Sequence, residues 1–269
     1  MDHLLRELAP ISTAGWAALE QDVTTALSEL LAARRVVDTE SAGGWHLSAV
    51  TTGRVSEIDS PDGPDVIARI RDVQPLVEFR TPFTLSRSEL DAIDRGSCDA
   101  DLDPARFAAR RAAMVEDKAV FHGYAPGGIV GITEATPHDP IIIDENYDAY
   151  PSFVAKATTR LKLSGVGGPY AIALGPKCFT GVMEQSEMGG YPVLEHLRLI
   201  LGGPVVFAPG INGAVVVSQR GGDFSIVLGE DFSIGYSSHD SESVELYIEE
   251  SFTVQVCAPE AAVYLTYAD

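Results

Sequence analysis

The chain has 269 residues, of which 45% are hydrophobic, and its 39 acidic residues against 19 Lys and Arg give a formal net charge of −20. This hydrophobic content excludes extended disorder, and the length is enough for one large domain or two small ones with a sizeable core. Because sequence-independent nucleic-acid binding relies on a cationic surface, the charge argues against a nucleic-acid partner.

The C-terminal part of the chain carries half of the net charge. Residues 221–269 contain ten Asp or Glu and no Lys or Arg. The same part contains strand-like runs, so it is not an acidic disordered tail. Two interpretations stay open, which are a solvated acidic face that keeps the protein soluble and an acidic surface that faces cations or a basic partner.

The three cysteines, Cys98, Cys178 and Cys257, lie far apart and form no CxxC pattern. Such a set predicts reduced thiols in a cytoplasmic protein. The N-terminus lacks a basic start followed by an apolar stretch, and no apolar run approaches the ~18 residues that a membrane-spanning helix needs. We therefore expect a cytoplasmic protein with no secretion signal and no membrane partner.

The first predicted element is a helix over residues 13–35. Its apolar residues recur at three-and-four spacing and form one stripe, which consists of Trp16, Leu19, Val23, Leu27, Leu30 and Leu31. The stripe either packs on the chain's own core or forms one wall of a groove for another peptide.

A long two-stranded hairpin is predicted next, over Val50–Leu76. Apolar and polar residues alternate on both sides of the sequence SPDGP at 60–64, which is typical of a turn. An isolated hairpin is only marginally stable in water. We therefore expect it to lie either on its own domain or on a neighbouring subunit.

Two further helices have clear boundary signals. Ser86 and Glu89 are spaced as a capping box, and the helix that follows should end at Gly96. Asp103, followed by a proline, predicts the start of a long helix that ends near His122.

The rest of the chain mixes helices and strands. Residues 123–150 are rich in Gly, Pro and Asp and are predicted to be mostly loop. Helices are predicted at 153–163, 176–184 and 193–200, and strands at 171–174, 205–208, 214–218, 224–228, 232–236, 244–256 and 262–267. This order has no βαβ rhythm, so the predicted fold class is α+β.

No pattern in the sequence supports an enzyme. GxSxG, HExxH and P-loop motifs are absent, and Gly165–Gly168 lacks the third glycine of a dinucleotide loop. The six histidines are isolated from one another, so no metal site is predicted. Glu116 and Asp117 are adjacent on a helix and point in different directions, so we interpret them as members of helical ion pairs with nearby basic residues. We predict no catalytic residue, no metal and no cofactor.

Several short stretches together resemble the family 1 encapsulin shell proteins, also labelled linocin- or bacteriocin-like. Each stretch is weak alone, but their common order along nearly the whole chain is specific. They are Leu8-Ala9-Pro10, Trp16, Ala33–Asp38, Arg80–Leu85, Glu89–Gly96, Glu116-Asp117, Gly168-Pro169-Tyr170, Gly190-Tyr191-Pro192, Arg220–Phe224, Leu228–Tyr236, Glu250–Thr253 and Pro259-Glu260-Ala261.

The resemblance implies a tailed-phage major-capsid fold of the Hong Kong 97 type and self-assembly into a closed icosahedral nanocompartment. It implies the smallest, T=1 class, which by symmetry has 60 copies. The enclosed cargo would be an enzyme such as a ferritin-like iron-oxidising protein or a dye-decolourising peroxidase. The resemblance further divides the chain into an N-terminal arm and helix (1–49), an extended hairpin loop (50–76), a peripheral domain with a spine helix (77–130), an axial domain (131–222) and more strands of the peripheral domain (223–269).

Two groups of site residues are carried over from the resemblance. The C-terminal targeting peptide of the cargo would dock inside the shell on Leu27, Leu30, Leu31, Arg34, Asp38, Asp231, Phe232 and Ile234. The fivefold pore would be lined or flanked by Glu187, Met188, Gly189, Gly190 and Tyr191, although a glycine pair is equally typical of a tight turn.

Two alternative functions are weighed against the shell subunit. A prophage major capsid protein of the same fold would be expected to have a more basic inner face, so the net charge of −20 argues against it. A secreted antibacterial protein or hydrolase would need a secretion signal or a catalytic motif, and neither is found. For an iron-storing shell, the acidic surplus would help to draw Fe²⁺ inward.

Overall fold

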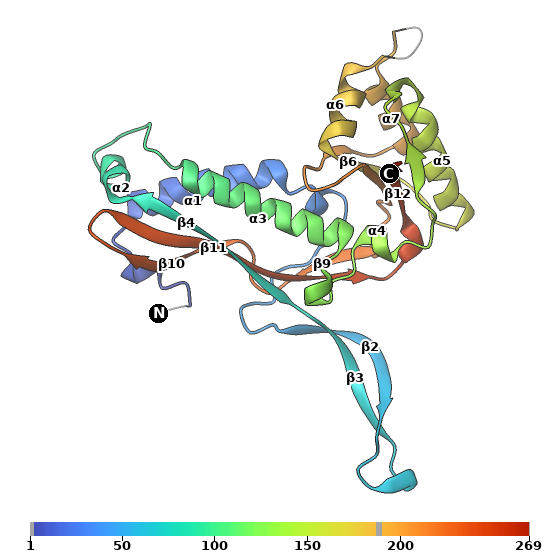
Figure 1. The fold of residues 1–269 in the computed structure, drawn as a ribbon, viewed down its shortest axis with the longest axis horizontal. Helices are drawn as coiled ribbons and strands as arrows, with labels where there is room; N and C mark the ends of the chain where they lie inside the picture. Colours follow the sequence, from blue (N-terminus) through green and yellow to red (C-terminus); the bar gives the residue numbers. More distant parts are fainter. Residues whose placement is uncertain (1–2, 187–189, 269) are drawn as a thin grey trace.

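The computed structural model describes residues 3–186 and 190–268, which form two helix-covered sheets and a long projecting hairpin (Figure 1). The first sheet has five strands, with the order β1-β9-β11-β10 and with β4 also paired to β11. Its strands are β1 (Asp38–Thr39), β4 (Val77–Ser86), β9 (Phe224–Leu228), β10 (Ser233–His239) and β11 (Ser243–Val256). β11 is the central strand, because it pairs antiparallel with β4, β9 and β10.

Two long helices, α1 (Thr13–Leu30) and α3 (Asp103–His122), lie side by side over this first sheet (Figure 1). Between them and the sheet is a core of aliphatic and aromatic side chains, among them Leu19 of α1 and Leu85 of β4. Small side chains let the helices and the sheet approach closely, and α3 supplies them as Ala105, Ala108, Ala109, Ala112 and Ala113. The short helix α2 (Arg87–Asp94) packs at one end of this layer.

The second sheet has the strand order β5-β12-β8-β6-β7. The strands are β5 (Ile141–Ile143), β6 (Tyr170–Leu174), β7 (Val205–Phe207), β8 (Ala214–Ser218) and β12 (Ala262–Tyr267), and the helices around them are α4 (Ile132–Ala135), α5 (Tyr150–Leu163), α6 (Pro176–Glu184) and α7 (Val193–Leu201). β6 and β8 are buried at every position, as expected for central strands that are covered on both faces. Among the residues described, no helix is both long and apolar enough to cross a membrane.

The strands expected over residues 223–269, as further strands of the peripheral domain, lie in two different sheets. β9, β10 and β11 are in the first sheet, but β12 pairs parallel with β5 and antiparallel with β8. The chain therefore returns at its C-terminal end to the second sheet, as Figure 1 shows.

Two local predictions are wrong. Ser86 makes no capping hydrogen bond, and Glu89 accepts a hydrogen bond from the backbone N–H of Asp101 at 2.9 Å, so the capping box is not formed. The helix expected over 13–35 ends at Leu30 and is followed by a separate turn of 3₁₀ helix at Ala33–Arg35.

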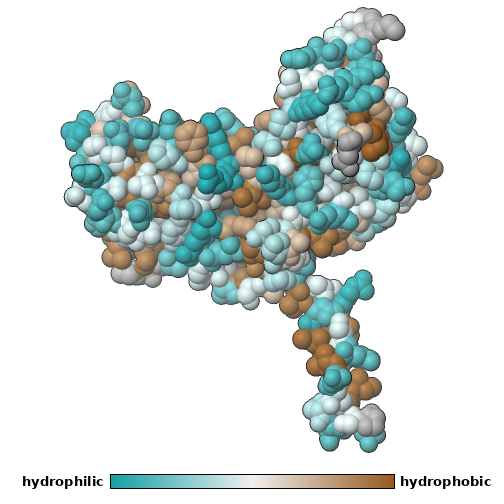
Figure 2. Space-filling view, in the orientation of Figure 1, coloured by the Kyte–Doolittle hydropathy of each residue, from teal (hydrophilic) through white to brown (hydrophobic). Residues whose placement is uncertain are grey.

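The predicted hairpin is confirmed as β2 (Ala49–Ile58) and β3 (Ala68–Pro75), which project far from the first sheet (Figure 1). The strands pair antiparallel, with a register shift between Thr51 and Val55. Hydrophobic side chains line this ribbon and face solvent in the single chain, as Figure 2 shows. The exposed ones are Val55, Ile58, Val66, Ile67, Ile70 and Val73, with exposed fractions between 43% and 72%.

Candidate functional site

Seven of the eight residues expected to dock a cargo peptide gather where the end of α1 meets the start of β10. Leu27 and Ile234 are only 7% and 5% exposed and belong to the core below this place. Leu30, Leu31 and Phe232 are partly buried and pack on the edge of the same core. A peptide that arrives from solvent would therefore contact these three side chains, while the other two support them.

Arg34 lies at the centre of a network of acids from three different segments. Its Nε and Nη2 donate to the Glu116 carboxylate of α3, with the shortest bond at 2.6 Å. Nη2 also lies 2.6 Å from Glu250 of β11 and 2.9 Å from Asp231, which precedes β10. The guanidinium group lies 5.0 Å from the centre of the Phe232 ring. The network thus ties the turn after α1 to α3, to β11 and to the candidate docking residues.

The acids of this network differ sharply in exposure. The side chains of Glu116 and Glu250 are 0% and 3% exposed, whereas that of Asp231 is 51% exposed. Burial opposes the charge of Arg34, but its hydrogen bonds and ion pairs with the three acids outweigh this and raise its pKa. Burial, the charge of Glu116 and a hydrogen bond with Glu116 raise the pKa of Glu250 well above its ordinary value.

Asp117, the neighbour of Glu116, holds the same turn from its other side. Its carboxylate accepts hydrogen bonds from the backbone N–H groups of Ala33 at 2.8 Å and Ala32 at 3.3 Å. Burial raises the pKa of Asp117 to about 7, against the effect of these two hydrogen bonds. The acid therefore changes charge near neutral pH.

The predicted helical ion pairs of Glu116 and Asp117 are wrong, because both acids are fully buried and bind to other segments. One signal in the sequence identifies their position. The alanine row of α3 continues at three-and-four spacing from Ala112 and Ala113 to these two acids, which puts them on the inward face.

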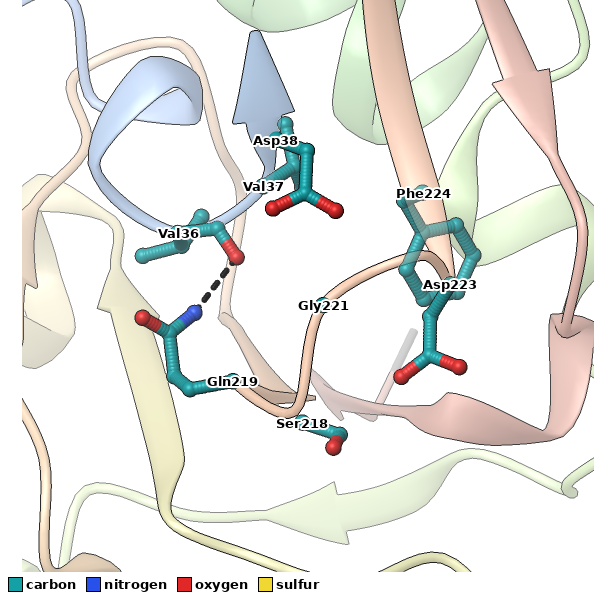
Figure 3. A pocket seen from close by; sticks show the side chains of 8 residues that line it. All are labelled: Val36, Val37, Asp38, Ser218, Gln219, Gly221, Asp223 and Phe224. Carbon is teal, nitrogen blue, oxygen red and sulfur yellow. Dashed lines mark hydrogen bonds between the residues drawn. The ribbon is translucent and has the colours of Figure 1, made fainter.

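Asp38, the eighth candidate, is engaged elsewhere. It lies on β1, and its Oδ2 accepts a hydrogen bond from the backbone N–H of Gly222 at 2.6 Å. Beside it is a small cavity of about 60 Å³, around which Figure 3 shows Asp38, Gln219 and Asp223. Gln219 donates to the carbonyl of Val36 at 2.6 Å (dashed in Figure 3), and Asp223 is paired with Arg220. All three side chains already have partners, and these contacts connect β1 to the turn before β9.

Two of the candidate pore residues, Gly190 and Tyr191, lie just before α7, at the far end of the second sheet from the hairpin (Figure 1). Glu187, Met188 and Gly189 lie outside the residues that the structure describes. Gly190 has a φ of +79°, a conformation that favours glycine, and Tyr191 is 46% exposed. The pore assignment stays a prediction.

The described parts of the chain, 3–186 and 190–268, contain no group of three or more His, Cys, Asp or Glu that could hold a metal ion. The buried acids around Arg34 are held by a guanidinium group and by backbone N–H groups instead. The chemistry of this site is therefore that of ion pairing and proton binding.

Solved structures that share this fold are those of shell particles. The virus-like particle from Pyrococcus furiosus matches with a TM-score of 0.65 at 15% identity and covers 92% of this chain and 97% of that one. The capsid of the Myoviridae phage XM1 matches with a TM-score of 0.55 at 12% identity over 89% of this chain and 92% of that one. At such identities the likeness concerns the fold alone, and it confirms the expected α+β fold of the Hong Kong 97 capsid type. By its architecture, the chain has a capsid-type fold.

Sequence relatives narrow this class. A family model described as "Encapsulating protein for peroxidase" matches residues 1–253. The type 1 encapsulin shell protein of Rhodospirillum rubrum is 47% identical over 270 residues, which cover 98% of this chain and 96% of the relative. That of Mycobacterium tuberculosis is 41% identical and covers 99% of this chain and all of the relative. The chain belongs to the type 1 encapsulin shell protein family, as its motifs indicated, and the relatives are structural proteins rather than enzymes.

Proposed function

We propose that this chain assembles in the cytoplasm into a closed icosahedral shell of the T=1 class, with 60 copies, around a cargo enzyme. Family membership and the capsid-type fold support the shell. The single observation that carries the assembly step is the hairpin β2–β3, which the subunit itself leaves uncovered.

The hairpin exposes apolar side chains on both of its faces. Residues directly opposite in the ladder share a face, so Val55 lies on the side of Arg71, whereas Ile58 and Ile70 lie on the other side. A ribbon that packed on its own domain would be apolar on one face only. The apolar side chains on both faces therefore support the proposal that the hairpin is buried between other copies of the chain.

Assembly is tested by size-exclusion chromatography and negative-stain microscopy of the purified protein. We expect uniform hollow particles that contain no nucleic acid. A sample that stays monomeric at every concentration would overturn the proposal. Particles filled with DNA would favour the alternative of a prophage capsid, which the charge of −20 disfavours.

For the cargo, we infer that a C-terminal targeting peptide docks on Leu30, Leu31 and Phe232 beside Arg34. Partly buried apolar side chains next to a charged group are suited to hold the apolar residues of a peptide and to fix its direction. Co-expression with a fluorescent protein that carries the C-terminal peptide of a cargo gene next to the shell gene tests this. Phe232→Ala should lower the fluorescence per shell, whereas Glu29→Gln, an exposed change on α1, should not.

A ferritin-like iron-oxidising protein or a dye-decolourising peroxidase is the cargo class that we propose, with small solutes entering at a fivefold pore formed by the loop of Gly190 and Tyr191. The acidic surplus supports the passage of cations such as Fe²⁺. Stopped-flow uptake of Fe²⁺ by loaded shells at low and high salt tests this part. Uptake should slow as salt screens the charge, and a rate independent of salt would contradict it.

A further inference from the structure

Two buried carboxyl groups, Glu116 and Glu250, lie behind the proposed docking surface and depend on one cation. The charged groups that face them come from every segment packed there. They are Arg34 from the turn after α1, Asp117 from α3 and Asp231 from the turn before β10. The group thus contains one positively charged side chain and four acids, of which three are fully or almost fully buried.

This arrangement needs a proton. Arg34 Nη2 lies 2.6 Å from Glu116 Oε2 and 2.6 Å from Glu250 Oε1, so two buried carboxyl groups meet at one guanidinium nitrogen. Arg34 cannot neutralise both, because its Nη2 is also drawn to Asp231. Two carboxylates in contact, away from water and with one cation between them, do not both ionise.

We propose that Glu250 keeps a proton beside Glu116, and that its release as the pH rises loosens the Arg34 turn and weakens the docking of the cargo peptide. The second half of this inference rests on the proposed docking function, whereas the first half does not. The proton is assigned to Glu250, whose side chain is 3% exposed and accepts a hydrogen bond from Arg34 Nη2 at 2.6 Å.

Loss of the proton affects the docking residues through Arg34. The two carboxylates then repel each other across the one guanidinium group that both contact. Arg34 contacts both of them and also binds Asp231 and the ring of Phe232, so a shift of its guanidinium group moves both docking residues. Burial raises the pKa of Glu250, so the protonated form persists to higher pH than in an exposed glutamate and is lost as the pH rises.

The first experiment needs no cargo. Hydrogen exchange of assembled shells is measured between pH 6.5 and 9.5, corrected for the intrinsic pH dependence of exchange, over residues 28–36 and 230–234. Protection should fall above the titration midpoint. Glu250→Gln, whose amide can donate to Glu116 without titrating, should keep its protection throughout. Glu245→Gln, an exposed change on the same strand, should behave like the unchanged protein.

The second experiment measures the binding of a synthetic peptide with the C-terminal sequence of a candidate cargo. Its affinity should fall by up to tenfold per pH unit above the midpoint, as expected for one linked proton, and should be independent of pH in Glu250→Gln. If that variant does not fold, Glu116→Gln replaces it. Protection that is independent of pH, or that falls equally in the variant, would overturn the proton site. A peptide that binds at no pH, with protection changing as expected, would instead refute the docking function and leave the proton site standing.

Discussion

The hairpin offers the sharpest test of how the subunits hold together. Ile58, Ile67 and Ile70 are 52%, 72% and 53% exposed in the single chain. Full burial of such a side chain contributes about 1.5–3 kcal/mol, so burying the exposed part of each on assembly contributes about 1–2 kcal/mol. We therefore expect the triple change of these residues to Ser to cost about 3–5 kcal/mol per subunit, which lowers the association constant of each contact by about two to four orders of magnitude.

The assay compares the dissociation of shells in guanidinium chloride, followed by light scattering, with the unfolding of the dissociated subunit, followed by circular dichroism. The triple variant should form no shells or should dissociate at a much lower denaturant concentration, while unfolding of the subunit stays nearly unchanged because the hairpin lies outside both cores. Thr51→Ser on the same ribbon serves as the control. Shells of unchanged stability in the triple variant would refute the reasoning, since the apolar ribbon would then contribute nothing to assembly.

Three further expectations concern the stability of the dissociated subunit in urea. Arg34→Met should lower the free energy of unfolding by about 3 kcal/mol, because it leaves buried acids without their cation; a neutral effect would mean that the network is not formed. Asp117 has a pKa of about 7 in the fold and about 4 when unfolded, so its protonated form stabilises the fold. This contribution to the free energy of unfolding is complete below pH 4, and about 4 kcal/mol of it is lost as the pH rises to 7. Asp117→Asn should remove this slope, and equal slopes would contradict the assignment. Gly213→Ala should lower the free energy of unfolding by about 2 kcal/mol or more, because φ is +86° and the new Cβ collides with a backbone oxygen of β12. Gly222→Ala, at φ +76° with open space around it, should lower it by only about 1 kcal/mol.

Local signals in the sequence predicted most of the helices and strands. α3 ends at His122 because Gly123 takes a φ of +82°, and α6 and β8 have the predicted bounds. β4 is absent from the sequence-based expectations although its inward and outward positions alternate, and its Pro82 falls on an outward, exposed position. A proline is tolerated on an edge strand, and in the described chain β4 pairs only with β11.

The candidate site was harder to predict because it is assembled from distant segments. Arg34 and Glu250 are 216 positions apart and meet only after α3 and β11 have packed together. Neither residue type nor spacing shows that a strand acid will lie under a helix, so no local rule assigns Glu250 to this network. The resemblance to the family gave Arg34, Asp231 and Phe232 as docking residues, whereas the pairing of Arg34 with Glu116 and Glu250 appears only in the fold.

The hairpin proposed for assembly and the proposed docking network are joined by the same pair of strands. β4 begins two residues after β3 ends, and Phe79 of β4 lies directly opposite Glu250 of β11. One antiparallel ladder, that of β4 and β11, therefore holds both the base of the projecting hairpin and Glu250, which lie within a few residues of each other. A change at Glu250 that shifts β11 must shift the root of the hairpin as well, because the register couples the two backbones. For docking variants in this network, shell stability should consequently be measured together with cargo load. A loss of cargo without any change in shell stability would show that the variant affects the docking surface alone.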